Sequence, residues 1–264
     1  MSIPFSKYHG AGNDFVLIDN RNNDFTPTAE TVKQLCHRQF GVGADGLMLL
    51  ENDTTTDFRM RYFNSDGGEA TMCGNGGRCI VVFANRLGII TTTASFMGVD
   101  GIHEANIIGS DVSLKMKDVD SVETDDDFYL IDTGSPHFVK FVENVDSVNV
   151  ATEGKIIRNS YNIGGNGVNA NFVQITPEGL KIRTFERGVE AETLACGTGA
   201  VAAAIAATHW LDLTEPTINV FALGGTLRVS FNRTDNSIFS NIWLTGPAVH
   251  VFDGEINIPA FGYN

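Results

Sequence analysis

Apolar and polar residues alternate in several short segments of the chain. The alternation is clear in Phe58–Phe63 and Val112–Lys117, and it returns in the second half in Leu180–Arg183 and Leu227–Phe231. Successive side chains of a strand point to opposite faces of a sheet, so this pattern predicts strands with one face on a core and one face in water. Both halves are therefore expected to contain a mostly antiparallel sheet.

Two segments depart from the alternation. Val201–Ala207 is apolar on every side and rich in Ala, which predicts a helix that is buried all round and enclosed by a curved sheet. Ile80–Ala84 contains β-branched residues that could also form a strand. Gly88 is suited to end a helix, and the matching position in the second half favours a helix here too.

Each of these segments follows a similar short phrase. The phrases are Glu69-Ala-Thr-Met-Cys73-Gly-Asn-Gly-Gly and Glu192-Thr-Leu-Ala-Cys196-Gly-Thr-Gly-Ala. Because one copy lies in each half, the sequence predicts a duplicated unit. The expected fold class is α+β, with two similar domains, each a mostly antiparallel curved sheet wrapped around a central buried helix. The acidic, turn-rich segment Asp118–Asp127 is the expected boundary between them.

The duplicated cysteines suggest a proton-transfer site. A Cys that precedes a helix lies where backbone N–H groups and the helix dipole favour a thiolate and can bind an anion. Two such helix starts, one after Cys73 and one after Cys196, could hold one carboxylate with its α-carbon between the sulfurs. One thiolate would remove the α-proton while the other thiol returns a proton from the opposite side. That chemistry is racemisation or epimerisation.

The other cysteines and the remaining motifs do not indicate a second reactive or ligand-binding site. Cys36 and Cys79 have no repeated partner and are expected to be small buried apolar residues. The sequence has no C-x-x-C pair, no Cys/His cluster with zinc-ligand spacing and no nucleotide-binding glycine loop. We therefore expect no metal and no cofactor.

Composition and charge limit the classes of partner that the protein can bind and the cell compartment in which it is expected. The chain has 264 residues, with 18 basic and 32 acidic residues and a formal net charge of −14. Such a charge repels nucleic acid and anionic membranes. The N-terminal residues do not resemble a secretory signal, and no apolar run approaches the ~20 residues that span a bilayer. A cytoplasmic protein with reduced thiols, a small-molecule substrate and no nucleic-acid or membrane partner is expected.

Taken together, the motifs resemble those of diaminopimelate epimerases over nearly the whole chain. The resemblance rests on Lys7-Tyr-His-Gly-Ala-Gly-Asn13-Asp-Phe, Gly41-Val-Gly-Ala-Asp45-Gly, Tyr62-Phe-Asn64-Ser-Asp-Gly-Gly-Glu69, Met72-Cys-Gly-Asn-Gly-Gly-Arg-Cys79, Gly134-Ser-Pro-His137, Asn169-Ala-Asn-Phe172, Glu186-Arg-Gly188 and Leu194-Ala-Cys-Gly-Thr-Gly199. The last phrase alone also resembles proline racemases.

This resemblance implies a pyridoxal-independent enzyme that interconverts LL- and meso-diaminopimelate, with Cys73 and Cys196 as the acid–base pair. His137 and Glu186 match positions that, in this family, adjust the pKa values of the two cysteines. The residues implied in substrate binding are Asn13, Asn64, Gly74, Asn75, Asn169, Glu186, Arg187, Gly197 and Thr198, with Arg187 facing the distal carboxylate.

The resemblance also implies an arrangement of domains. The first domain would comprise residues 1–117 with 249–264, because the last strand of the relatives returns to it, and the second would comprise 118–248. The active site would lie in the cleft between them. Members of the family are typically homodimers.

Three positions depart from the family pattern. Ser135 stands where Asn is usual, which implies a shorter or water-mediated contact to the distal end of the substrate. Gly46 stands where some members have Gln, and the spacing from Glu186 to Cys196 is one residue longer than in many members. None of these departures alters the cysteine pair.

Other functions remain open from the residues. A racemase for another amino acid, such as proline, would give Asn64, Glu186 and Arg187 no distal group to bind. A cysteine hydrolase would need only one Cys with a His base. A binding module would hold an amino acid without exchanging its α-hydrogen.

Overall fold

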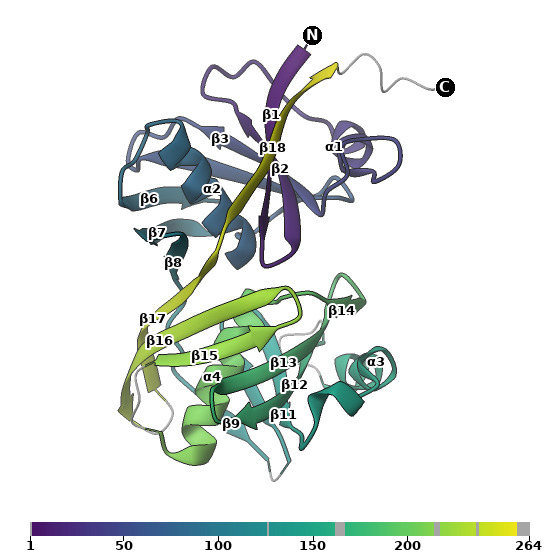
Figure 1. Cartoon of the computed structure of the whole chain (residues 1–264), viewed down its shortest axis with the longest axis vertical. Coiled ribbons are helices and arrows are strands. Elements are labelled where there is room, and N and C mark those ends of the chain that lie inside the picture. The colour runs from purple at the N-terminus through teal and green to yellow at the C-terminus, as the bar shows by residue number, and fades with distance from the viewer. Residues whose placement is uncertain (1, 126, 162–166, 214–216, 236–237, 258–264) are drawn as a thin grey trace. The chain divides into compact units, whose positions relative to one another are not determined.

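The structure is a computed structural model that describes residues 2–125, 127–161, 167–213, 217–235 and 238–257. It divides into two compact units (Figure 1). Unit 1 comprises Met1–Leu114 and Pro247–Asn264, and unit 2 comprises Lys115–Gly246.

Unit 1 is a mixed sheet with two helices. Its elements are β1 (Ser2–Gly10), β2 (Asn13–Asp19), α1 (Ala29–Cys36), β3 (Gly46–Glu51), β4 (Phe58–Asn64), β5 (Glu69–Ala70), α2 (Gly74–Arg86), β6 (Thr93–Gly98), β7 (Gly101–Ile108), β8 (Asp111–Lys115, ending on the first residue of unit 2) and β18 (Val249–Asn257). The last strand, β18, pairs antiparallel with β1. The chain therefore begins and ends in the same unit.

Unit 2 repeats this order of elements. It contains β9 (Glu123–Thr124), β10 (Tyr129–Asp132), β11 (Pro136–Phe141), the short 3₁₀ helix η1 (Val145–Ser147), α3 (Val150–Ser160), β12 (Asn169–Thr176), β13 (Gly179–Glu186), β14 (Ala191–Thr193), α4 (Gly197–Leu211), β15 (Thr217–Ala222), β16 (Gly225–Asp235) and β17 (Ile238–Pro247).

The strand pairings confirm that the two units are similar. In unit 1, β2 runs parallel to β3 and β4 runs parallel to β6, while β3 and β4 are antiparallel. In unit 2, β11 runs parallel to β12 and β13 runs parallel to β15, while β12 and β13 are antiparallel. Helix α2 joins β5 to β6 as α4 joins β14 to β15. Most other pairings are antiparallel, so the α+β class with mostly antiparallel sheets is confirmed, with two parallel pairs in each unit among the described strands.

The two central helices have the burial that their sequences predict. In α4, Gly197 and every residue from Gly199 to Thr208 are buried. This helix contacts β10, β11, β12, β13, β15 and β16, which curve around it (Figure 1). Ile80–Ala84 lies within α2, and Gly88 follows the helix with a φ of 74°, as expected for a residue that ends a helix.

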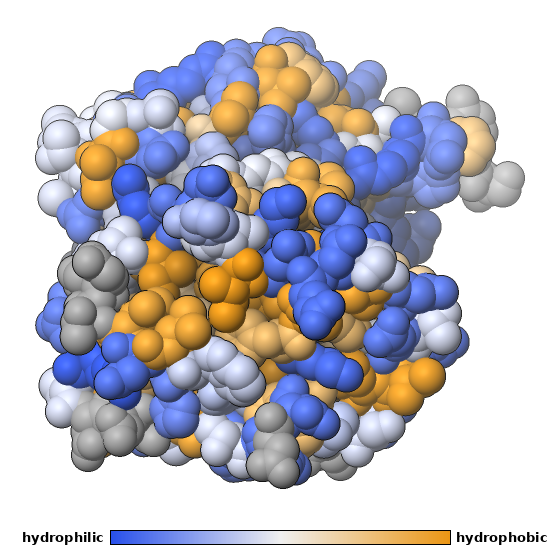
Figure 2. Space-filling view, turned by 60° about the horizontal axis from the view of Figure 1, so that its bottom comes forward, coloured by the Kyte–Doolittle hydropathy of each residue, from blue (hydrophilic) through white to orange (hydrophobic). Residues whose placement is uncertain are grey.

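In the face shown in Figure 2, apolar side chains form patches between polar ones. Large apolar side chains that are exposed include Leu194, Trp210 and Leu223. Within the described ranges, no helix has the length and apolar character that crossing a membrane requires.

Candidate active site

Cys73 and Cys196 occupy equivalent positions in the two units. Each follows a short strand, β5 or β14, and each is the N-cap residue of a central helix, α2 or α4. Neither side chain caps its helix by a hydrogen bond. This confirms the prediction that both cysteines precede helices, and it leaves each sulfur beside the positive end of a helix dipole.

Glycines let the first turn of each helix pack closely. A Cβ on Gly76 would lie 1.8 Å from Cε of Met48. A Cβ on Gly199 would lie 2.5 Å from Oδ1 of Asn171 and 3.4 Å from Sγ of Cys196. Only glycine therefore fits these two positions without displacing the residues around the cysteine turns.

In unit 1, Asn13 is the immediate neighbour of Cys73. Oδ1 of Asn13 lies 3.5 Å from Sγ of Cys73 and 3.3 Å from Nδ2 of Asn75. Nδ2 of Asn13 donates to Oδ2 of Asp45 at 2.6 Å. The structure thus brings Asn13, Cys73 and Asn75 together, as predicted, and adds Asp45 behind them.

Charged side chains hold this asparagine in place. Arg38 forms ion pairs with Asp45 at 2.6 Å and with Asp14 at 2.9 Å, and Lys7 pairs with Asp14 at 2.6 Å. Burial raises the pKa of Asp14, but the hydrogen bonds from Arg38 and Lys7 outweigh burial and lower the pKa to about 2. Asp14 is therefore a carboxylate at neutral pH, and the network anchors the turn that carries Asn13.

Asn64 differs from the other predicted residues of unit 1. It is the last residue of β4 and its side chain is exposed. Its backbone N–H donates to Gly68 at 2.9 Å, but its side chain has no hydrogen bond within the described part of the chain. A substrate role for Asn64 therefore stays a prediction.

Arg78 is a buried cation beneath the Cys73 turn that sequence reasoning missed. Its side chain is fully buried and donates to Oδ1 of Asn75 at 2.8 Å, and to the carbonyls of Gly74 at 3.2 Å and Pro247 at 3.3 Å. No carboxylate among the described residues pairs with it. Burial lowers the pKa of Arg78, although a guanidinium stays protonated in proteins. Its place five residues after Cys73, on the inner face of α2, was the available signal.

In unit 2, a row of polar side chains leads from β11 to Cys196. Nε2 of His137 lies 3.0 Å from Oγ of Ser135, and Oγ of Ser135 lies 3.2 Å from Oγ1 of Thr198. Oγ1 of Thr198 lies 3.4 Å from Sγ of Cys196. On the other side, Nδ1 of His137 lies 3.1 Å from Nδ2 of Asn171. His137 and Thr198 were predicted site residues, whereas Asn171 was not.

His137 is neutral in this environment. It is completely buried, and burial lowers its pKa from 6.5 to about 3. The charge of Arg187 lowers the pKa further, while Asp132 and Asn171 oppose the shift. His137 therefore acts as a hydrogen-bonding group and not as a cation near neutral pH.

The burial of His137 predicts a pH dependence of stability. The folded state takes up the histidine proton only near pH 3, while the unfolded state takes it up near 6.5. The unfolded state thus binds more protons between these values, so the unfolding free energy should fall as the pH drops below about 6.5, by up to about 1.4 kcal/mol per pH unit. Urea unfolding at pH 5.0 to 7.5 would measure the slope. His137→Gln should flatten it, and an unchanged slope in that variant would contradict the prediction.

The remaining predicted residues of unit 2 surround the end of β13. Asn169 accepts from the backbone N–H of Arg187 at 2.9 Å, and its Nδ2 lies 3.3 Å from Oγ of Ser135. Glu186 accepts from the hydroxyl of Thr193 at 2.9 Å. Arg187 is half-buried, and no described residue hydrogen-bonds to its guanidinium. It can therefore receive an anionic group.

Cys36 and Cys79 are structural residues, as predicted. Both are buried, and burial raises the pKa of each thiol to about 12. All four cysteines are free. Within the described ranges, no group of three or more His, Cys, Asp or Glu side chains could hold a metal.

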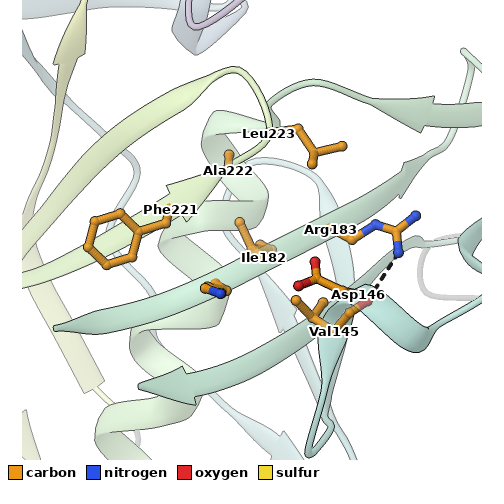
Figure 3. Close-up of a pocket in the computed structure, with 8 residues that line it drawn as sticks. Val145, Asp146, Ile182, Arg183, Phe221, Ala222 and Leu223 are labelled. Atoms are coloured by element: carbon orange, nitrogen blue, oxygen red, sulfur yellow. Dashed lines mark hydrogen bonds between the residues drawn. The ribbon is translucent and has the colours of Figure 1, made fainter. Parts of the chain in front are cut away.

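A shallow pocket of about 200 Å³ lies elsewhere in unit 2 (Figure 3). Its lining consists of Val145, Asp146, Lys181, Ile182, Arg183, Phe221, Ala222 and Leu223. Arg183 already donates to Glu192 at 2.6 and 2.8 Å and to the carbonyl of Val145 at 3.1 Å. The pocket contains neither a thiol nor any predicted site residue, so we do not assign the chemistry to it.

Comparison with known proteins agrees with the motifs. A family model described as diaminopimelate epimerase matches residues 5–116 and 129–251. The diaminopimelate epimerase of Flavobacterium psychrophilum is 53% identical over 95% of this chain and 98% of its own length, and that of Chlorobaculum tepidum is 44% identical over 94% and 99%. The crystal structure of a phenazine biosynthesis protein of the PhzF family from Bacillus anthracis has the same fold, with a TM-score of 0.73 at 15% identity over 97% of this chain and 99% of its own. The chain therefore belongs to the diaminopimelate epimerase family.

Proposed function

We propose that the protein is a cofactor-independent isomerase that interconverts LL- and meso-diaminopimelate, a step in lysine and peptidoglycan precursor synthesis. The observation that carries the proposal is the duplicated cysteine turn. One cysteine is the N-cap residue of a buried helix in each unit, at equivalent places in the same topology. Two proton-transfer groups of the same kind suit a reaction that removes a proton from one face of a carbon and returns one to the other.

In this proposal the two units face one substrate across a cleft, with the α-carbon between Cys73 and Cys196. The thiolate of one cysteine takes the α-proton and becomes a thiol. The other cysteine gives its proton to the opposite face and becomes a thiolate. The helix starts at Gly74 and Gly197 would bind the α-carboxylate and stabilise the negative charge that develops when the proton leaves.

The distal end of diaminopimelate carries a second ammonium and a second carboxylate. Arg187 is proposed to bind that carboxylate, because its planar guanidinium matches the two oxygens. Asn64, Asn169 and Glu186 are proposed to hold the remaining polar groups. We also propose a homodimer in the cytoplasm, and the four free thiols fit such a reducing compartment.

Proton NMR in heavy water tests the function directly. With LL- or meso-diaminopimelate, the α-proton signal should disappear as deuterium enters from the thiols, and the other epimer should accumulate. Proline serves as the matched substrate for the racemase alternative. Loss of the α-proton of proline, with diaminopimelate unchanged, would replace the proposed substrate; binding of diaminopimelate without any exchange would leave only a binding function.

A further inference from the structure

The hydrogen bonds around Cys73 have a fixed direction. Arg78 has donors only, so the oxygen Oδ1 of Asn75 must accept from it at 2.8 Å. This fixes the amide of Asn75, whose Nδ2 then donates to Oδ1 of Asn13 at 3.3 Å. At its other end, Asn13 donates from Nδ2 to the carboxylate of Asp45, which is paired with Arg38.

Both contacts orient the amide of Asn13 in the same way. Its oxygen Oδ1 therefore faces Sγ of Cys73 at 3.5 Å. A carbonyl oxygen can only accept, so this contact is favourable when the sulfur carries a proton and repulsive when it is a thiolate.

The hydrogen bonds that lead to Cys196 are fixed in the opposite sense. Nδ2 of Asn171 donates to the carbonyl of Phe138 at 2.9 Å, and Oδ1 of Asn171 accepts from the hydroxyl of Thr184 at 3.0 Å. The amide of Asn171 is thereby oriented, and its NH₂ group can only donate to Nδ1 of His137. The neutral imidazole then carries its proton on Nε2 and donates it to Oγ of Ser135.

Ser135 continues this order of donors and acceptors toward the sulfur of Cys196. Its Oγ accepts from His137 at 3.0 Å and from Nδ2 of Asn169 at 3.3 Å, which uses both acceptor sites of the hydroxyl. Its own hydrogen is left for Oγ1 of Thr198, at 3.2 Å. Thr198 then directs its hydroxyl hydrogen to Sγ of Cys196, at 3.4 Å. A donor aimed at sulfur favours the thiolate.

We propose that the resting enzyme holds Cys196 as the thiolate and Cys73 as the thiol, and that Ser135 and the Thr198 hydroxyl are the positioning residues that set this asymmetry. The consequence of this asymmetry for catalysis rests on the proposed function. The resting enzyme first accepts the epimer whose α-hydrogen faces Cys196. That proton moves to Cys196, Cys73 delivers its own proton to the other face, and exchange with solvent then restores the starting state.

Charged groups near the two sulfurs also affect how readily Cys73 and Cys196 lose their protons. Arg78 and Cys79 lie in α2, the helix that Cys73 precedes, and the positive charge of Arg78 favours a thiolate at Cys73, whereas the negative charge of Asp45 behind Asn13 opposes one. His137 is uncharged near Cys196, with Asp132 and Arg187 close enough to influence the histidine. The hydrogen bonds of the Arg78 guanidinium go to Asn75, Gly74 and Pro247, while the acceptor oxygen of Asn13 lies 3.5 Å from the sulfur of Cys73.

Alkylation by iodoacetamide measures the two thiols separately and needs no turnover. The free enzyme is treated for short times from pH 5 to pH 10, and the modification of Cys73 and of Cys196 is quantified by peptide mass spectrometry. Only the thiolate reacts, so the midpoint of each pH profile gives the pKa of that thiol, independently of how accessible the sulfur is. We expect a lower midpoint for Cys196 than for Cys73, by at least about one pH unit.

Variants then test the path to Cys196. Ser135→Ala and Thr198→Val should each raise the Cys196 midpoint and slow its alkylation at neutral pH by about tenfold, which corresponds to about one pKa unit, while the Cys73 midpoint stays constant. Ser135→Thr keeps a hydroxyl and should restore the wild-type profile. Thr133→Val is the matched control, because the Thr133 hydroxyl donates to the backbone carbonyl of Thr198 and not to its side chain. It should leave the Cys196 profile unchanged.

Three results would overturn the inference: a lower midpoint at Cys73, equal midpoints, or an unchanged Cys196 profile in both Ser135→Ala and Thr198→Val. Because the profile is recorded without substrate, each of these results is independent of whether diaminopimelate is epimerised. Conversely, a failure of deuterium exchange with diaminopimelate would remove the proposed function and leave the measured thiol asymmetry intact.

Discussion

Cys73→Ala and Cys196→Ala should each reduce the rate of epimerisation of diaminopimelate by roughly 10²- to 10⁴-fold, the contribution typical of a positioned acid or base. Each variant keeps one thiol at the start of a buried helix and loses the other. Epimerisation needs both, because the proton must leave one face of the α-carbon and return to the opposite face. Steady-state conversion of LL- to meso-diaminopimelate, followed by chiral chromatography, measures the loss.

Deuterium exchange distinguishes this mechanism from a simple loss of structure. A single remaining thiol can still remove the α-proton that faces it and return a deuteron to the same face. We therefore expect each variant to exchange the α-hydrogen of one epimer without inversion, with Cys73→Ala acting on one epimer and Cys196→Ala on the other. Exchange of the same epimer by both variants would contradict a two-sided site.

Cys36→Ala is the matched control for these changes. Cys36 is buried and burial raises its pKa to about 12, so it cannot serve as a thiolate near neutral pH. Its replacement should leave turnover at the wild-type level apart from a modest loss of stability. Full activity in Cys196→Ala, by contrast, would favour the cysteine hydrolase alternative, in which a second thiol is dispensable.

The fold was predictable where local pattern decides it. The two cysteine phrases predicted the duplication, and the all-apolar Val201–Ala207 predicted a helix enclosed by a sheet; both are confirmed. The parallel pairs, such as β2 with β3, were not predicted, because alternation reports which face is buried and not which strand lies alongside. Strand β8 ends at Lys115, two residues before the predicted end, and the backbone N–H of Met116 bonds to Ile242.

Helices α1 and α3 show a signal that the sequence prediction lacked. Each begins after a residue whose side chain caps the first turn: Thr28 accepts from the N–H of Thr31, and Asn149 accepts from that of Thr152. Such caps are recognisable in a sequence. Both helices are short and only partly apolar, so the hydrophobic pattern alone does not distinguish them from loops.

Some residues of the candidate site could be named from the sequence, but the hydrogen bonds that join them within each unit could not. Sequence motifs place His137 and Thr198 in the site, yet the resemblance assigns Ser135 only a contact with the distal end of the substrate. In the structure the Ser135 hydroxyl lies between His137 and Thr198. Its role depends on the turn after β10 meeting the start of α4, and no local pattern reports such a tertiary contact.

Arg187→Ala should lower kcat/KM for diaminopimelate by about 30- to 5,000-fold, because truncating one partner of a buried, charged hydrogen-bonded pair costs about 2–5 kcal/mol. Asn169 holds the backbone of Arg187 at 2.9 Å, so the residue is positioned even before a substrate binds. Arg187→Lys keeps the charge but loses the planar pair of donors and should recover only part of the activity. Initial rates over a range of substrate concentrations separate kcat from KM.

Lysine provides the matched substrate, because it has the same chain and both amino groups but lacks the distal carboxylate. If Arg187 binds that carboxylate, removing the arginine and removing the carboxylate eliminate the same interaction, and their effects on α-deuterium exchange should not add. Arg228→Ala, which removes an exposed cation from β16 of the same unit, controls for the change in net charge and should leave both rates unaltered. Equal losses on lysine and on diaminopimelate in Arg187→Ala would instead place this arginine in general support of the site, and near wild-type turnover on diaminopimelate would remove its assignment to the distal carboxylate.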